Sequence, residues 1–318
     1  MQRSNKIDKS RRQRVKRIKL PTPPGFSFPH AVQGHGWYDL PPFRFDEMSG
    51  TLSYVFRDRK TGRPVTGNIR EAEGGLEIEM TGKADEQGLI RDVRHILRFD
   101  EPLDAFYEIA EGKPGIGWAA QCKAGRLLRS ATVYEDLVKT MCTTNCSWSL
   151  TRKMAANLTE MLGDEAPDGR RAFPTPEAMA AVGPDFYREQ IRAGYRSPYF
   201  AELAEAVASG KLEPEAWLAS DLPTDELRKE MKRVKGIGDY AADNLLKLIG
   251  RYDGLALDSW LRAGFYKKHN KGRKCPDKKI DRHYAKYGDW RGLAIWCDMT
   301  ESWFEDKEEK AGGATAAG

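Results

Sequence analysis

The pattern of apolar residues changes about a third of the way along the chain. Up to about residue 80, apolar and polar positions alternate, which is typical of half-buried strands. Two segments each place three apolar side chains on one face: Leu52, Tyr54 and Phe56 in the first, and Leu76, Ile78 and Met80 in the second. Gly74-Gly75 marks a hairpin turn between strands centred on Ile69 and Ile78. Helical spacing follows at 92–97 and 103–110, so a small antiparallel sheet with helices on one side is expected.

From about Ser130 onward, apolar residues recur at helical spacing. Thr132 and Glu135 have the spacing of a capping box and begin a helix that runs to about Cys142. A second amphipathic segment, 150–162, ends at Gly163. Further helices are expected at 174–182, 186–193, 200–209, 214–218 and 224–234. The predicted fold class is therefore α+β, a small antiparallel sheet domain followed by a mainly helical body.

The predicted organisation has four parts. Residues 1–25 form a basic tail with few core-forming residues, which predicts disorder. Residues 26–112 form the sheet domain, and residues 113–304 form the helical body. Residues 305–318 are charged and then rich in Ala and Gly, which predicts a second disordered tail.

The net charge of +5 is unevenly distributed along the chain. Residues 1–20 alone carry nine Lys or Arg and one Asp, so the rest of the chain is slightly acidic. Such a tail either tethers DNA electrostatically or is simply solvated. A second basic cluster at 267–279 has the same two interpretations, a grip on phosphates or a solvated loop.

Composition narrows the class of protein. The 318 residues are 40 % hydrophobic and 31 % charged, and no apolar run is long enough to span a membrane. Five cysteines without a secretory signal favour reduced thiols inside a cell. We expect a location in the cytoplasm with the nucleoid, or in the nucleus of a eukaryote. The five histidines show no metal-binding spacing, so no metal site is expected.

The segment 231–243 predicts a helix, a tight turn and a second helix. The two glycines of the turn Gly236-Ile237-Gly238 let the backbone bend sharply and approach a ligand closely. Free N–H groups at the start of the second helix suit a phosphate, and Lys235 adds a positive charge beside them. These features predict contact with a DNA backbone, independent of base sequence. Twenty residues after Gly238, Asp258 opens another helix as its N-cap.

This arrangement resembles the helix-hairpin-helix superfamily of DNA glycosylases, over about residues 45–304. Two further stretches, 127–145 and Gly194-Tyr-Arg-Ser-Pro-Tyr199, resemble segments of its 3-methyladenine and 8-oxoguanine branches. The resemblance implies that Lys235, Gly236, Ile237 and Gly238 hold the DNA backbone.

It also implies that Asn145 probes the opposite base, that Tyr195 wedges the duplex, and that Arg196 contacts DNA. The alternatives for the first two are a loop-capping Asn and a buried Tyr.

By the same resemblance, Asp258 is the catalytic residue. Breaking an N-glycosidic bond builds positive charge on the sugar, and a fixed carboxylate stabilises that charge. Placement at a helix N-terminus favours the ionised carboxylate. An N-cap aspartate is also common without any catalytic role, so the hairpin upstream is what favours catalysis.

Tyr240 occupies the position where the lyase-competent members carry a lysine nucleophile. Tyrosine cannot form an imine, so strand cleavage is not expected. Its ring can stack on a flipped base, or it can belong to the core of the second helix. Trp148, Trp260 and Tyr199 are further candidates for the base pocket, with a place in the core as the alternative for each.

The predicted function is a monofunctional DNA N-glycosylase that flips a damaged base out of the duplex and removes it by hydrolysis. Alkylated purines are the expected substrates. The alternatives are an oxidised-purine glycosylase of the 8-oxoguanine type and a non-catalytic hairpin protein that only binds DNA.

The cofactor and partner expectations follow from the same resemblance. Some relatives hold an iron–sulfur cluster with four closely spaced cysteines, a set this chain lacks, so neither a cluster nor another cofactor is expected. The resemblance allows a potassium or sodium ion at the hairpin turn. The expected partner is double-stranded DNA containing damaged bases, with no membrane contact and a monomeric protein.

Overall fold

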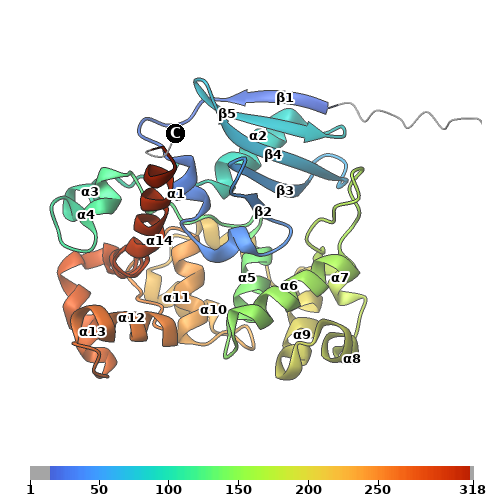
Figure 1. Cartoon of the computed structure of the whole chain (residues 1–318). Coiled ribbons are helices and arrows are strands. Elements are labelled where there is room, and N and C mark those ends of the chain that lie inside the picture. Colours follow the sequence, from blue (N-terminus) through green and yellow to red (C-terminus); the bar gives the residue numbers. More distant parts are fainter. Residues whose placement is uncertain (1–14, 316–318) are drawn as a thin grey trace, which may run out of the picture.

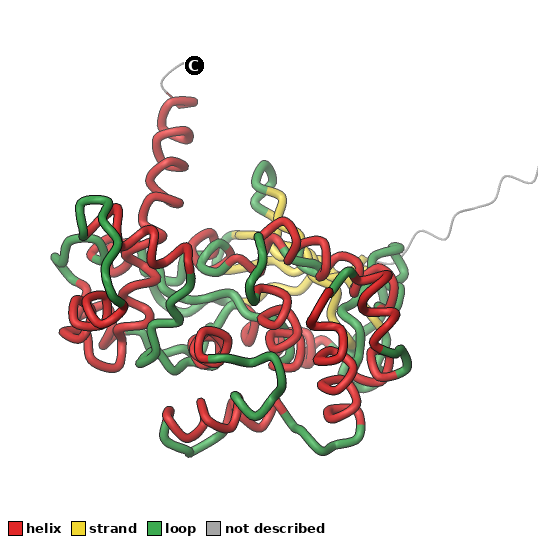
Figure 2. Tube along the Cα trace, turned by 90° about the horizontal axis from the view of Figure 1, so that it is seen from below, coloured by secondary structure: helices red, strands yellow, loops and turns green. Residues whose placement is uncertain are grey.

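The computed structural model describes residues 15–315, with side chains up to Phe304. A sheet forms one layer, and helices form a broad body beneath it (Figure 1). Seen from below, the last helix stands out from this body (Figure 2). No helix of the described residues is long and apolar enough to cross a membrane. The predicted fold class, a small antiparallel sheet followed by a mainly helical body, is confirmed.

The sheet has five antiparallel strands in the order β1-β5-β4-β3-β2. Their bounds are β1 (Val15–Leu20), β2 (Arg44–Asp46), β3 (Thr51–Arg57), β4 (Pro64–Ala72) and β5 (Gly75–Thr81). The predicted hairpin turn joins β4 to β5, where Gly74 and Gly75 have φ angles of 80° and 146° that favour glycine.

Strand β1 departs from the prediction of a disordered N-terminal tail. It pairs along its whole length with β5, and its Ile18 and Leu20 side chains are buried. The lysines and arginine between them face outward, so a strand at the sheet edge has the composition of a basic tail. Residues 1–14 of the predicted tail lie outside the described residues.

Helices account for most of the remaining chain. The N-terminal half contains α1 (Phe28–Val32), α2 (Glu86–Ile96), α3 (Asp104–Ala110), α4 (Gly117–Gln121), α5 (Val133–Thr143) and α6 (Trp148–Leu162). The C-terminal half contains α7 (Pro176–Ala180), α8 (Pro184–Phe186), α9 (Ser197–Ala208), α10 (Thr224–Met231), α11 (Asp239–Leu248), α12 (Ser259–His269), α13 (Asp277–Tyr284) and α14 (Arg291–Thr315). Helix α14 therefore runs through most of the segment that was expected to be a disordered C-terminal tail.

The apolar side chains gather into three main cores. The first lies between the sheet and helices α1 and α2, and includes Phe28, Ile69 and Val93. The second holds α5, α6 and α9 to α11 together, and the third joins α3 and α4 to α12, α13 and α14. Helix α11 belongs to the second core but its last residue, Leu248, packs in the first. Such a shared helix holds the layers in fixed positions.

Buried polar contacts lock the sheet layer onto the helical body. The Tyr54 hydroxyl donates to Glu135 at 2.5 Å, and Lys139 pairs with the same carboxylate at 2.6 Å. Trp37 Nε1 donates to the buried carboxylate of Asp136 at 2.7 Å. These partners satisfy groups that would otherwise be costly to bury, so the loop that carries Trp37 has one position relative to α5.

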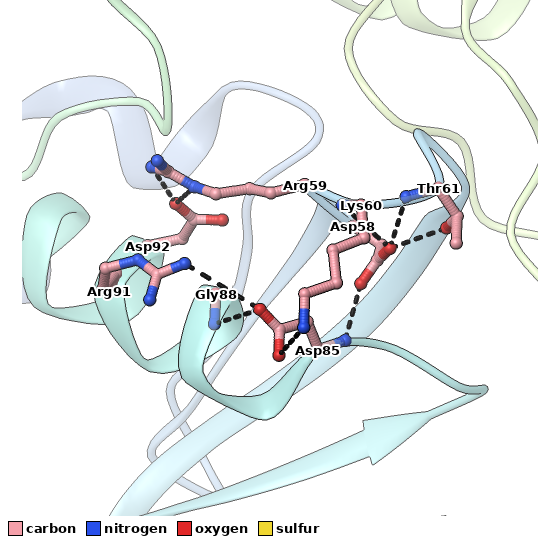
Figure 3. A network of polar contacts seen from close by, with 8 residues as sticks. All are labelled: Asp58, Arg59, Lys60, Thr61, Asp85, Gly88, Arg91 and Asp92. Carbon is pink, nitrogen blue, oxygen red and sulfur yellow. Dashed lines mark hydrogen bonds and ion pairs between the residues drawn. The ribbon is translucent and has the colours of Figure 1, made fainter.

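A second polar network fixes the start of α2 against the β3–β4 turn (Figure 3). The Asp58 carboxylate accepts hydrogen bonds from the Thr61 N–H at 2.7 Å and the Asp85 N–H at 2.6 Å. These bonds lower the pKa of Asp58 to about 2. Asp85 in turn caps α2 by accepting from the Gly88 N–H at 3.2 Å.

Candidate active site

The turn between α10 and α11 has the geometry that its two glycines predict. Gly236 has a φ of +89°, and a Cβ there would lie 2.8 Å from the Tyr199 ring, so only glycine fits. Gly238 is the N-cap of α11 with no side-chain cap, and open space surrounds its Cα. The first N–H groups of α11 are thus open to an anion.

Charged side chains flank this turn on its exposed face. Lys235 is exposed and pairs with Glu202 at 2.7 Å, while Lys232 pairs with Asp239 at 2.6 Å. The hydrogen bond from Lys232 lowers the pKa of Asp239. Ile237 is buried in the second core, so it anchors the turn from below.

A second exposed loop carries the residues predicted to probe and wedge the duplex. Asn145 has a φ of 47° and its Nδ2 donates to the Tyr195 hydroxyl at 3.2 Å. The Tyr195 side chain is 51 % exposed, which leaves its ring free to contact a ligand. The structure therefore brings together two residues that lie fifty positions apart in sequence.

Arg196, which the sequence assigned to DNA contact, is buried beneath this loop. Its Nε donates to the Met141 backbone oxygen and to Thr144 Oγ1, both at 3.1 Å. Its guanidinium also lies 4.5 Å from the centre of the Tyr195 ring. These contacts make Arg196 a support for the loop, with no surface left for a phosphate.

A cavity of about 530 Å³ opens where the three cores meet. This volume suits a flat organic ligand. Seven aromatic residues line it, namely Trp37, Tyr38, Trp148, Tyr240, Trp260, Trp296 and Trp303. Asp258 lines the same cavity and is half-buried. Aromatic rings together with polar groups are typical of a site that binds a planar ring.

The Asp258 carboxylate is held in place by the start of α12. It accepts the Leu261 N–H at 2.7 Å, as expected of an N-cap. The preceding loop is fixed as well, because Lys247 donates to the Leu255 oxygen at 3.0 Å and Arg262 to the Leu257 oxygen at 3.1 Å. No ion pair involves Asp258 within the described part of the chain.

Three of the four predicted pocket residues line this cavity. Trp148 donates from Nε1 to Asp39 at 2.7 Å, and the Trp260 ring lies 5.3 Å from that of Trp303. Burial raises the pKa of Tyr240 to about 12, so its phenol stays neutral. Tyr199 is the exception, since it lies under Gly236 and outside the cavity lining.

The cavity also contains polar residues that sequence reasoning missed. Lys247 is almost fully buried, and burial lowers its pKa to about 8. His35 is 4 % exposed, and burial together with the charge of Lys247 lowers its pKa to about 3. Residues 240, 244 and 247 share one face of α11, so a lysine at helical spacing from Tyr240 was a usable signal. No sequence pattern connected His35 with this helix.

A second hollow of about 540 Å³ lies on the other side of α11. Its lining is mostly charged, with six aspartates and four basic side chains, several of which pair with one another. Tyr240 is the one aromatic ring in this lining, so the hollow offers little surface for stacking on a planar base. The aromatic cavity beside Asp258 is therefore the better candidate for an active site.

The structure gathers one group of metal-ligand side chains that the sequence spacing did not indicate. Donor atoms of His269, His283 and Asp298 lie within 4.8 Å of one another. The Asp298 carboxylate, however, already accepts from the His269 ring at 2.6 Å and the Tyr284 hydroxyl at 2.5 Å, and Lys268 pairs with it at 2.8 Å. These partners satisfy the buried carboxylate, so the group is explained as a polar network.

Comparisons with known proteins identify this architecture. No protein-family model matches the chain, and no curated protein matches it in sequence. A 3-methyladenine DNA glycosylase from Archaeoglobus fulgidus superposes with a TM-score of 0.69 at 19 % identity, over 91 % of this chain and 99 % of that one. MBOgg1, solved with a low-affinity DNA ligand, gives a TM-score of 0.71 at 19 % identity, over 91 % and 96 % of the two chains.

An 8-oxoguanine glycosylase/lyase from Clostridium acetobutylicum, bound to double-stranded DNA with cytosine opposite 8-oxoguanine, is also similar. Its TM-score is 0.65 at 15 % identity, over 86 % of this chain and 93 % of that one. The chain therefore has the fold of these DNA glycosylases over nearly its whole length.

Proposed function

We propose that the protein is a monofunctional DNA N-glycosylase, which flips a damaged base out of duplex DNA and hydrolyses its N-glycosidic bond. One observation carries this proposal: a half-buried carboxylate, Asp258, is fixed at a helix N-terminus in an aromatic cavity beside an uncapped hairpin helix. The shared fold supports it.

In the proposed reaction, the flipped base enters the cavity and stacks on its aromatic walls. Positive charge develops on the sugar as the bond to the base breaks, and the Asp258 carboxylate stabilises it. The same carboxylate orients a water molecule and takes its proton as the oxygen adds to C1′. The products are a free base and an abasic site.

In this proposal, the hairpin turn before α11 and the exposed loop around Asn145 bind the DNA duplex. Backbone N–H groups at the start of α11 bind a phosphate, with Lys235 close by. Tyr195 enters the space that the flipped base leaves, and Asn145 bonds to the orphaned partner base.

The positions of the amines support hydrolysis without strand cleavage. A lyase needs an amine that reaches C1′, and α11 carries Tyr240 in its first turn. Lys247 follows seven residues later, about 10 Å deeper along the helix at about 1.5 Å per residue. Lys235 is exposed and paired with Glu202, outside the cavity.

The substrate class is a damaged purine. Aromatic walls of this kind stack on alkylated purines, the class favoured by the sequence, and equally on oxidised purines. A non-catalytic clamp is disfavoured, because Asp258 faces an open cavity and forms no ion pair among the described residues.

A panel of duplexes, each with a single modified base, tests this proposal. The purified protein should create alkali-labile sites in at least one duplex, with no strand breaks before alkali or heat. Borohydride should trap no covalent complex, since Lys247 is the one lysine among the described residues that line the cavity and it lies two turns beyond Tyr240 on α11. A trapped adduct would contradict monofunctional chemistry and make Lys247 the first lysine to test. Strands that stay intact after alkali in every duplex would contradict the glycosylase function itself.

A further inference from the structure

Building on the proposed glycosylase function, we propose that Lys247 and His35 make the cavity select an uncharged purine lesion. In this scheme the Lys247 ammonium stabilises the negative charge that forms on the base as it leaves. Lys247 and His35 form what we call the floor of the cavity. The aromatic rings of the cavity stack equally on charged and uncharged purines, so selection between them depends on this floor.

In this scheme Lys247 meets the base, while Asp258, which lines the same cavity and whose charge acts on Lys247, meets the sugar. Lys247 shares a face of α11 with Tyr240, lines the cavity, and lies two turns deeper than that tyrosine. Its side chain is almost fully buried, with Nζ 5.8 Å from the centre of the Trp296 ring. Within the described residues it donates one hydrogen bond, to the Leu255 oxygen at 3.0 Å. An ammonium has three N–H groups, so two remain for a ligand.

His35 supplies a second polar group at the same place. Its ring packs 4.3 Å from Trp37 and 5.4 Å from Trp296, and it forms a hydrogen bond with the Asn244 amide. Its buried Nδ1 has no hydrogen-bond partner in the part of the chain that the structure describes. A buried polar atom without a partner is costly, and a purine edge would satisfy it.

The charge of the purine decides whether its binding beside the Lys247 ammonium is favourable. A purine alkylated at N3 or N7 is cationic in DNA and would meet the Lys247 ammonium at close range. It also leaves as a neutral molecule, so it needs no help from a cation. An uncharged purine leaves with the electron pair of its bond to C1′, and the resulting negative charge gains from an ammonium in a low-dielectric cavity.

The bonds and protons balance in the proposed step. The bond between C1′ and the purine nitrogen breaks, and its electron pair goes to the purine. The water oxygen bonds to C1′ and gives its proton to Asp258, while the Lys247 ammonium keeps its proton and donates a hydrogen bond to the departing purine anion. Solvent then protonates the released purine and takes the proton from Asp258. Alkylated purines that carry no positive charge stay within the selected class, whereas cationic ones are excluded from it.

The charged groups around Lys247 set the pH range of this effect. Burial opposes the ammonium most strongly, while the carboxylates of Asp243 on α11 and Asp258 before α12 favour it, and the result is a pKa of about 8. His35, in the segment between α1 and β2, is neutral near pH 8, because its pKa is about 3. Lys247 is thus protonated below about pH 8 and loses its charge above it.

Single-turnover excision of two kinds of lesion tests the inference. The probes are duplexes with 8-oxoguanine or hypoxanthine, which are uncharged, and a duplex with 7-methylguanine, which is cationic. The wild-type protein should excise at least one uncharged lesion faster, with a rate that falls above about pH 8. Lys247→Met should slow that excision by about tenfold or more, leave 7-methylguanine excision equal or faster, and remove the fall above pH 8.

The exposed Lys229→Met is the matched control and should change none of these rates. Lys247→Arg, which keeps the charge, should retain the preference for uncharged lesions. Faster excision of 7-methylguanine by the wild type would overturn the inference and leave the glycosylase intact. An equal loss of excision rate for both kinds of lesion in Lys247→Met would also overturn it. Lys247 would then only stabilise the loop before α12 through its hydrogen bond to the Leu255 oxygen. Absence of any excision by the wild type would overturn the proposed function as well.

Discussion

At the scale of single residues, side chains from several helices meet at one cavity. Asp258, Tyr240, Trp148 and Trp260 were all predicted for the site and all line the cavity. Tyr199 was predicted for the base pocket and Arg196 for contact with DNA, but Tyr199 packs under the hairpin turn and Arg196 is buried. A motif gives the position of a residue along the chain, and only packing gives the direction in which its side chain points.

Tyr240 offers a sharp test at this scale, because its proposed role needs a ring and not a hydroxyl. Tyr240→Phe should keep most of the single-turnover excision rate. Tyr240→Ala should lower it by roughly 5- to 100-fold, the usual effect of losing one aromatic ring that stacks on a base. Equal rates in the wild type and the alanine variant, both folded by circular dichroism, would show that the ring packs in the core without touching the base.

At the scale of elements, helical periodicity was the most reliable signal. The predicted segments 150–162 and 224–234 correspond to α6 (Trp148–Leu162) and α10 (Thr224–Met231). Thr132 caps α5 as predicted, by accepting the Glu135 N–H at 3.1 Å. Glu135 does not complete the capping box, because its carboxylate instead pairs with Tyr54 and Lys139. That partner on the sheet is a tertiary contact, which local spacing cannot reveal.

The hairpin turn separates two roles of glycine in one element. Gly236→Ala forces a left-handed backbone and a Cβ 2.8 Å from the Tyr199 ring, so unfolding free energy should fall by at least about 1–2 kcal/mol. Gly238→Ala has an ordinary φ of −94° and open space, so stability should change little. It should weaken DNA binding instead, because the added methyl group lies where a phosphate approaches. Urea unfolding of both variants measures the effect on stability, and DNA titration measures the effect on affinity. An unchanged DNA affinity in Gly238→Ala would show that the turn does not meet DNA.

At the scale of the whole molecule, the site exists only because three cores meet. The cavity is lined by residues 35–39 between α1 and β2, and by residues of α5, α6, α11, α12 and α14. Sequence reasoning predicted a sheet domain and a helical body, and this architecture is confirmed. It could not predict His35 in the site, since no local pattern relates position 35 to position 247. The two come together through packing of the sheet layer on the helices.

The uneven charge of the chain gives a prediction at the same scale. Residues 1–14 carry six Lys or Arg and one Asp, and they precede β1, so they can be removed without breaking the sheet. Their deletion should weaken DNA binding at low salt and flatten the salt dependence of affinity, with the single-turnover rate almost unchanged. The measurement is a series of DNA titrations at increasing salt. An unchanged slope would mean that this segment makes no contact with phosphates.

The most direct test of the proposed chemistry is the single-turnover excision rate of Asp258→Asn, measured beside its affinity for the same lesion duplex. Asparagine can still accept the Leu261 N–H but cannot stabilise a cationic sugar. The rate should fall by about 100-fold or more with affinity nearly unchanged. Asp185→Asn, at an exposed carboxylate that pairs with Arg188, should match the wild type. A near-normal excision rate in Asp258→Asn would contradict the assignment of Asp258 as the catalytic residue.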